Sequence, residues 1–282
     1  MFGSLTASVT DMLPTCLPWY LERGDGPLIA AAIHDGRAMR PELIGSIALS
    51  EADRLREEDP FTGTWTGVAP TRLIALHSRF EVDFNRPRES AVYLTPDDAW
   101  GLRVWRKKLS ADCVERSLAI HDAFYDEVRG LLRRMVQRYQ RVVVLDLHTY
   151  NHRRTGPDAA PAEARDNPEV NIGTGTMDRA RWAPIVDRFI VDLRNFDFLG
   201  KHLDVRENVK FRGGFFPAWI HKNFPDSVCV LAVEVKKSFM DEWTGEPDRI
   251  QLSAIKRALK STVWGIHEEL VKLGLKQKGI PA

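Results

Sequence analysis

The sequence predicts an α/β fold, a single-domain three-layer sandwich built around a mixed, mostly parallel sheet. Short apolar runs of strand length alternate along the chain with longer amphipathic patterns of helix length. The clearest strand pattern is Arg141–Leu147, where three consecutive valines follow a helical pattern and lead directly to His148. The 282 residues, 44% of them hydrophobic, suffice for one large core, so we expect residues 1–282 to form one domain.

The predicted elements follow one another in a βα order. The first core strand is Pro27–Ile33, which ends abruptly at His34-Asp35-Gly36. A helix is predicted at Pro41–Glu51, and residues 52–58 lead into an acidic turn that Asp59-Pro60 closes, because the residue before proline disfavours helix. The later predicted elements are strands at Thr71–Leu76 and Phe80–Phe84, a helix at Ser117–Tyr139, the valine-rich strand, a helix at Met177–Asn195, a strand at Ser227–Val235 and a helix at Arg249–Lys272.

Charge and cysteine usage narrow the class of protein. Forty lysines and arginines balance thirty-nine acidic residues, and a net charge of +1 gives no field that would attract nucleic acid or an acidic membrane. No apolar run approaches the length of a membrane span, and the N-terminus lacks a basic start. Cys16, Cys113 and Cys229 show no paired spacing, which argues against disulfides. We therefore expect a cytoplasmic protein that acts on a small molecule.

Two histidines and an acidic turn are the candidate metal ligands. A catalytic zinc takes three protein ligands from histidines and carboxylates and leaves a position for water. His34 and His148 both stand at the ends of predicted strands, and the turn Glu57-Glu58-Asp59 offers three carboxylates without indicating which one binds. The alternative is that His34 is a loop residue, His148 caps a strand and the acidic turn is solvated. Asp146 is expected on the same face as His148, where it would accept the ring proton.

Glu234 is the candidate general base. It lies on the predicted strand Ser227–Val235, whose other residues are almost all apolar. An unpaired carboxylate is costly in such surroundings, so we expect either a metal-bound water or a cation beside it. The alternative is an ion pair with a basic residue such as Lys236.

Asn85 and Arg86 are the candidate residues for binding a substrate carboxylate. The planar guanidinium and the side-chain amide match a carboxylate group, and arginine does this better than lysine. The alternative is a structural pair between Arg86 and Glu81 or Glu89. His221 follows two glycines and an aromatic stretch, and we expect it to face the same pocket.

Taken in order, these segments resemble the motifs of the N-formylglutamate amidohydrolase family, which is related to the zinc carboxypeptidases and to deacylases such as aspartoacylase. The most specific match is Ser78–Pro87, which is similar to the family pattern Ser-Arg-Tyr-x-x-Asp-Leu-Asn-Arg-Pro. The resemblance extends from about Ile29 to Asp241. The other similar segments are Ile33–Gly36, Glu57–Asp59, Asp146–Thr149, Phe211–Gly214 with the downstream His221, and Glu234–Asp241.

The resemblance implies a zinc-carboxypeptidase-like fold with one Zn²⁺ per chain. It favours Asp59 as the carboxylate ligand beside His34 and His148. Zinc would lower the pKa of a bound water and polarise the substrate amide. Glu234 would take the proton from that water and pass it to the leaving amine, while Arg79 would stabilise the tetrahedral oxyanion.

The resemblance also implies a substrate pocket, although it does not fix the substrate. Asn85 and Arg86 would hold the substrate's α-carboxylate, with Gly214 and His221 nearby. Three departures from the family pattern touch the predicted pocket: Asp35 replaces a serine, residues 167–173 are altered, and Lys237 stands where arginine is common.

The predicted function is a zinc-dependent amidohydrolase that cleaves the amide of an N-formyl or other N-acyl amino acid, such as N-formyl-L-glutamate. The first alternative is a carboxypeptidase-like hydrolase of small peptides with a free C-terminal carboxylate. The second is a non-catalytic descendant that binds a metal or ligand, and Glu234 argues against this because a binder needs no base.

Overall fold

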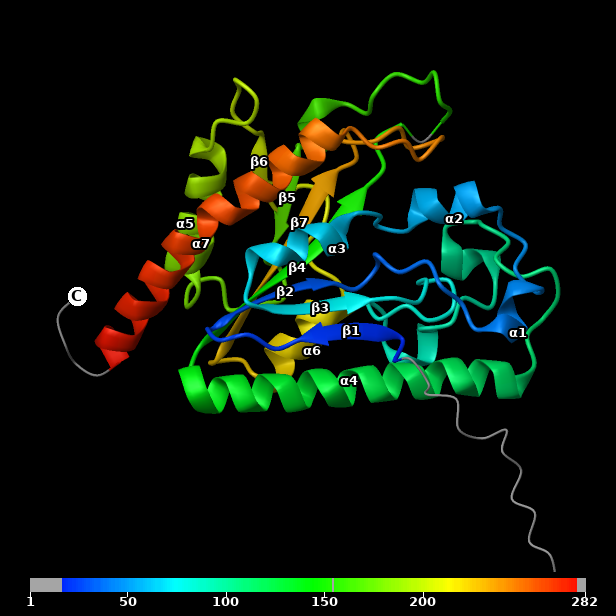
Figure 1. The fold of residues 1–282 in the computed structure, drawn as a ribbon, viewed down its shortest axis with the longest axis horizontal. Helices are drawn as coiled ribbons and strands as arrows, with labels where there is room; N and C mark the ends of the chain where they lie inside the picture. The colour runs from blue at the N-terminus through cyan, green and yellow to red at the C-terminus, as the bar shows by residue number, and fades with distance from the viewer. Residues whose placement is uncertain (1–16, 154, 278–282) are drawn as a thin grey trace, which may run out of the picture.

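The computed structural model describes residues 17–153 and 155–277, which build a seven-stranded sheet covered by helices on both faces (Figure 1). Along the sheet the strand order is β1-β3-β2-β4-β7-β5-β6. The strands are β1 (Trp19–Glu22), β2 (Leu28–Ala32), β3 (Thr71–Ala75), β4 (Val142–Tyr150), β5 (Val170–Gly173), β6 (Val205–Glu207) and β7 (Val228–Lys236).

The centre of the sheet is parallel and its margins are not. Strands β3, β2, β4 and β7 run parallel to one another, β1 is antiparallel to β3, and β5 is antiparallel to β7 but parallel to β6. The predicted α/β fold with a mixed, mostly parallel sheet is therefore confirmed. Its central strands are buried on both sides, as expected where helices cover both faces.

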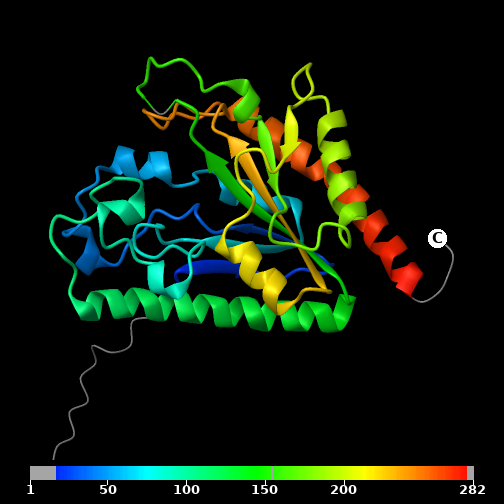
Figure 2. The same cartoon turned by 180° about the vertical axis from the view of Figure 1, so that it is seen from behind.

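Helices form a layer on each face of the sheet (Figures 1 and 2). Alternate residues of the central strands pack against one layer or the other. On β4, Val143 and Leu145 pack in the core that contains α5 and α7, whereas Val142 and Val144 pack in the core that contains α4 and α6. The helices are α1 (Pro41–Ile44), α2 (Glu51–Glu57), α3 (Thr62–Trp65), α4 (Ala111–Tyr139), α5 (Ala183–Asn195), α6 (Phe215–Asn223) and α7 (Arg249–Gln277).

Side-chain caps explain where two of these helices begin. Ser50 opens α2 with a capping box, in which its hydroxyl accepts the Asp53 N–H and the Asp53 carboxylate accepts the Ser50 N–H. Ser110 caps α4 by accepting the N–H of Cys113, so this helix begins at Ala111, six residues before the predicted Ser117.

Several sequence-based boundaries were wrong. Phe80–Phe84 is a buried turn, because Glu81 donates its N–H back to the Ser78 carbonyl at 2.9 Å instead of joining a strand. The helix predicted at Pro41–Glu51 is only the short α1 followed by the start of α2, and α5 begins at Ala183 rather than Met177. Strands β1, β5 and β6 are three or four residues long and had no sequence signal.

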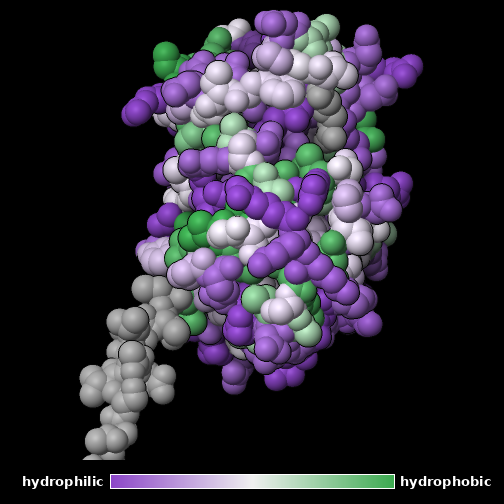
Figure 3. Space-filling view, turned by 90° about the vertical axis from the view of Figure 1, so that its right-hand side faces the viewer, coloured by the Kyte–Doolittle hydropathy of each residue, from purple (hydrophilic) through white to green (hydrophobic). Residues whose placement is uncertain are grey.

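Within residues 17–153 and 155–277, no helix combines the length and the apolar character needed to cross a bilayer. The face shown in Figure 3 is mainly hydrophilic, and its hydrophobic side chains form small separate areas.

Candidate metal centre and active site

Neighbouring central strands carry polar residues at the same end of the sheet. His34 follows β2 by two residues, His148 lies on β4, and Glu234 lies on β7 directly beside His148 in the strand register. Because side chains alternate along a strand, Asp146 points to the same face as His148. The parallel topology therefore brings these groups together although they are far apart in the sequence.

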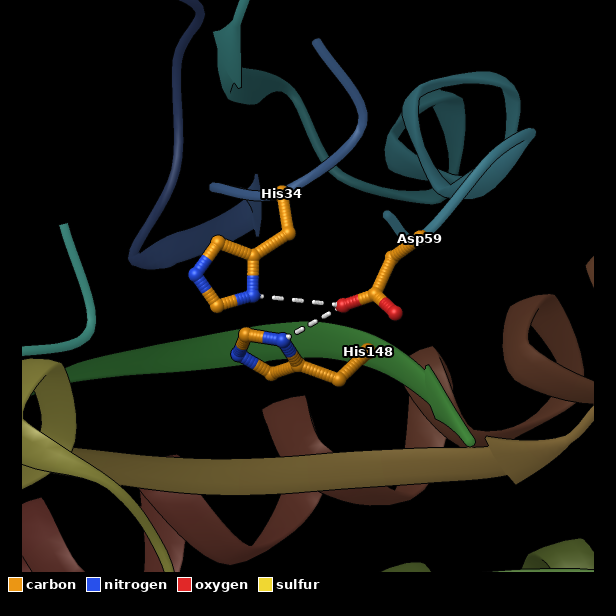
Figure 4. A group of neighbouring side chains, drawn as sticks. All are labelled: His34, Asp59 and His148. Atoms are coloured by element: carbon orange, nitrogen blue, oxygen red, sulfur yellow. Dashed lines mark hydrogen bonds and ion pairs between the residues drawn. The ribbon is translucent and has the colours of Figure 1, made fainter. Parts of the chain in front are cut away.

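His34, Asp59 and His148 converge so that one ligand atom from each lies within 4.8 Å of the others (Figure 4). Asp59 Oδ2 lies 2.9 Å from His148 Nδ1 and 3.4 Å from His34 Nδ1. All three residues are buried, and His34 Nδ1 has no hydrogen-bond partner among the described residues. A buried nitrogen without a partner is costly. A divalent cation between the three groups would satisfy it, so the donor set fits a metal ion.

In each histidine ring, the nitrogen that does not face Asp59 lies beside a second carboxylate. His34 Nε2 lies 2.7 Å from Asp83 Oδ1, and His148 Nε2 lies 3.0 Å from Asp146 Oδ1. An Nε2–H that is donated to a carboxylate leaves the neutral ring with a free lone pair on Nδ1. Metal-binding histidines are commonly oriented in this way. Both Nδ1 atoms face Asp59, and in this tautomer each can serve as a ligand for a cation.

Asp59 is the member of the acidic turn that reaches the two rings. Its Oδ1 also accepts the Thr149 hydroxyl at 2.8 Å. Burial alone would raise the pKa of Asp59, but the two adjacent histidine rings hold it below its ordinary value. The other two carboxylates of the turn have partners other than the histidine rings. Glu58 accepts the Ser78 hydroxyl, and Glu57 accepts the Asn151 amide at 3.1 Å.

A cavity of about 220 Å³ opens beside this cluster. All three candidate metal ligands line it. Four of the six predicted catalytic and substrate-binding residues also line it: Arg79, Asn85, Gly214 and Glu234. The structure thus places the candidate base and part of the predicted substrate site around the candidate metal centre.

Glu234 is a partly buried carboxylate without a paired cation. No hydrogen bond or ion pair of residues 17–153 and 155–277 involves its side chain. The alternative partner Lys236 donates instead to the Asn167 carbonyl at 3.2 Å. Burial raises the pKa of Glu234 to about 8, against an ordinary value of 4.5. Its pKa therefore lies close to neutrality, the range suited to a group that takes and returns a proton.

Arg79 is held rigidly at the cavity wall. Its guanidinium donates to Asp83 Oδ2 at 2.8 Å and to the Tyr93 hydroxyl at 3.2 Å, and it lies 4.9 Å from the centre of the Trp100 ring. Asp83 therefore orients Arg79 as well as His34.

Gly214 leaves the space that the Asn85 side chain occupies. A Cβ atom at Gly214 would lie 2.3 to 2.5 Å from the atoms of the Asn85 amide group, which is too close for any real contact. Asn85 Oδ1 accepts the Phe216 N–H at 3.0 Å, so this amide has a fixed orientation at the cavity wall.

Two residues predicted for the substrate site, Arg86 and His221, lie outside the cavity lining. Arg86 does not line the cavity, because its guanidinium lies over the Tyr93 ring at 4.6 Å and its Nε lies 3.8 Å from Asp83 Oδ2. His221 does not line it either. Its Nε2 accepts the Val230 N–H at 3.0 Å and its Nδ1 lies 2.9 Å from the Thr176 hydroxyl, so both ring nitrogens serve the fold.

Comparison with known proteins agrees with this geometry. The sequence model of the N-formylglutamate amidohydrolase family matches residues 26–240, about three quarters of the chain. The chain belongs to the N-formylglutamate amidohydrolase family. It is therefore a member of a hydrolase family, and the matched range contains all three candidate metal ligands and Glu234. The resemblance seen in the sequence motifs is confirmed.

Solved structures share the fold of this N-formylglutamate amidohydrolase family member. An N-formylglutamate amidohydrolase from Ralstonia eutropha JMP134 aligns with a TM-score of 0.69 at 18% identity, covering 94% of this chain and all of that one. A gene product of Agrobacterium tumefaciens aligns with a TM-score of 0.58 at 17% identity, covering 92% of this chain and 96% of that one. No curated protein sequence matches the chain.

Sequence reasoning missed two residues of this amidohydrolase site, Asp83 and Arg212. Asp83 lies inside the most specific motif, but its position gave no indication that it would contact the His34 ring. Arg212 lines the cavity, and so does Lys237, which was expected at the pocket wall. The Arg212 motif was noted as a family feature, and the basic character of Arg212 was the available signal.

Proposed function

We propose that this protein is a zinc-dependent amidohydrolase that releases the free amine from an N-formyl or other N-acyl amino acid, such as N-formyl-L-glutamate. The observation that carries the proposal is the convergence of His34 Nδ1, Asp59 Oδ2 and His148 Nδ1 at the wall of a cavity that Glu234 also lines. Membership of the amidohydrolase family supports the reaction class.

Zinc is the proposed metal because two imidazoles and one carboxylate are a ligand set found in catalytic zinc sites. His34, Asp59 and His148 would hold one ion per chain. When bound, zinc supplies an acidified water and a Lewis acid for the amide carbonyl.

Glu234 is the proposed proton carrier. As a carboxylate it would accept a proton during attack on the amide and return that proton to the leaving amine. Its place beside His148 in the strand register keeps it next to the proposed metal centre. Arg79 would stabilise negative charge on the amide oxygen, since Asp83 and Tyr93 already hold its guanidinium in place.

Substrate binding is assigned to residues of the cavity wall. Asn85 would offer its amide, with Gly214 providing the room for it. Arg212 is the cation that we propose for the substrate carboxylate, in place of Arg86, because Arg212 lines the cavity and has no ion pair with a described carboxylate. The cavity of about 220 Å³ is smaller than the roughly 300 Å³ at which typical ligand pockets begin. This size supports a substrate no larger than an acylated amino acid.

We propose that residues 1–282 form a single domain in the cytoplasm. The support is the one continuous sheet and the free state of Cys113 and Cys229, which suits a reducing compartment.

The proposal is tested by metal analysis joined to a deacylation screen on one preparation. We expect one zinc per chain and faster release of amine from N-formyl-L-glutamate than from N-acetyl amino acids or dipeptides. Preferred cleavage of dipeptides would replace the proposal with the peptidase alternative. Stoichiometric zinc without turnover on any of these substrates would instead support the alternative of a non-catalytic, metal-binding descendant.

A further inference from the structure

Lys237 is a buried lysine in the cavity wall whose amine bonds the backbone of another segment. Only 1% of the residue is exposed. Its Nζ donates to the Arg56 carbonyl at 2.6 Å and to the Glu58 carbonyl at 2.8 Å. Ordering and burying a lysine is unfavourable unless such bonds compensate for it. The role proposed for Glu234 and the candidate metal ligands does not explain this arrangement.

The two carbonyl groups belong to the end of α2 and to the turn that carries Asp59. Helix α2 ends at Glu57, and Glu58 has extended backbone, with φ −75° and ψ 169°. The last carbonyls of a helix have no partner within the helix, and a cation there also faces the negative end of the helix dipole. Lys237 therefore supplies the bonds that this helix end lacks.

Asp59 is held on its other side by the strand region that carries His34. The Asp59 N–H donates to the His34 carbonyl at 2.9 Å. The backbone before Asp59 is bonded to Lys237, and the backbone at Asp59 is bonded to His34. These contacts hold the backbone from which the Asp59 carboxylate projects toward the two rings.

We propose that Lys237 is a positioning residue for the metal-binding carboxylate of Asp59. It acts through the backbone of the turn and not through the metal or the substrate. Lys237 follows β7 directly and comes three residues after Glu234, so one strand end carries the proposed base and also holds the loop of a metal ligand. This inference rests on the zinc site proposed above.

The test compares the zinc affinity of Lys237→Met with that of Lys236→Met. Methionine keeps a long side chain but donates no hydrogen bond. Lys236 is the matched control, since it is the adjacent lysine and donates to the Asn167 carbonyl instead of the Asp59 turn. Metal-free protein is titrated with Zn²⁺ in competition with a chromophoric chelator, and melting of the metal-free protein reports folding. Steady-state kinetics are recorded at saturating zinc.

We expect Lys237→Met to lose about tenfold to a hundredfold in zinc affinity and Lys236→Met to stay within about twofold of the parent. Lys237→Arg, which can donate to both carbonyls, should restore most of the affinity. A folded Lys237→Met that binds zinc as tightly as the parent would overturn the inference, even if its melting temperature falls. If Lys237→Met does not fold, Lys237→Arg decides, and a loss of affinity above about tenfold in that variant overturns the inference. A parent protein that binds no zinc would instead refute the proposed zinc site itself.

Discussion

Asp83 Oδ1 lies 2.7 Å from His34 Nε2, and the same carboxylate binds the Arg79 guanidinium at 2.8 Å through Oδ2. One fully buried carboxylate thus orients a candidate metal ligand and the arginine proposed to stabilise the oxyanion. Burial alone would raise the pKa of Asp83, but the adjacent Arg79 and His34 hold it well below its ordinary value. The group is therefore ionised throughout the neutral range and accepts both bonds.

Replacing this carboxylate should weaken metal binding. Asp83→Asn keeps the shape of the side chain but removes the charge that fixes the His34 ring. We expect zinc affinity to fall by about tenfold to a hundredfold, measured by chelator competition. Asp35→Asn is the control, because Asp35 is also largely buried but accepts the Gly63 N–H at 2.9 Å and contacts neither ring. Equal zinc affinity in the two variants would show that Asp83 does not support metal binding.

Turnover should depend on the Glu234 carboxylate. Glu234→Gln preserves shape while removing the proposed proton acceptor, so we expect kcat to fall by about a hundredfold to ten-thousandfold. Zinc content should remain that of the parent. Turnover per folded molecule is measured beside melting on the same preparation. A destabilised variant with parental turnover would show that Glu234 is a structural residue.

The same substitution should change how stability depends on pH. Burial raises the Glu234 pKa from 4.5 to about 8, so the folded metal-free protein keeps a proton that the unfolded chain has released. The free energy of unfolding of the parent should therefore fall as pH rises across this window. Glu234→Gln lacks this loss. Its stability relative to the parent should rise by at least about 1.4 kcal/mol between pH 5 and pH 8, the equivalent of one pKa unit. Urea unfolding of chelator-treated protein measures the difference, and parallel pH profiles would contradict the pKa shift.

The carboxylate of the substrate should be bound by Arg212 and not by Arg86. Arg212→Met is expected to raise KM for N-formyl-L-glutamate by about tenfold or more with a smaller change in kcat, since it removes binding shared by ground and transition states. Arg86→Met, which removes a guanidinium outside the cavity lining, should change KM by less than about threefold. A larger rise in KM for Arg86→Met than for Arg212→Met would show that Arg86 binds the substrate carboxylate.

The sequence was most informative where the direction of the strands alone determines which side chains come together. His34 and His148 could be predicted as partners because the carboxyl ends of neighbouring parallel strands meet at one edge of the sheet. Asp146 followed from strand alternation. The choice of Asp59 over its acidic neighbours came from the resemblance, because a turn without regular geometry does not reveal which side chain points inward.

The sequence was least informative in the segment around Phe80–Phe84. Alternating apolar residues predicted a strand, but the same pattern occurs in this buried turn, where Val82 and Phe84 pack in the core. Asn85 and Arg86 are consecutive residues of that segment, and the local backbone directs one to the cavity wall and the other onto Tyr93. Spacing in the sequence does not determine such side-chain directions.

The central claim, that His34, Asp59 and His148 hold a catalytic zinc, is tested most directly by removing and restoring the metal. Amine release from N-formyl-L-glutamate is measured on one preparation as purified, after chelation and after readdition of one equivalent of Zn²⁺, with metal content determined at each stage. We predict one zinc per chain, loss of nearly all turnover on chelation, and recovery on readdition. Unchanged turnover by the metal-free protein would contradict the account.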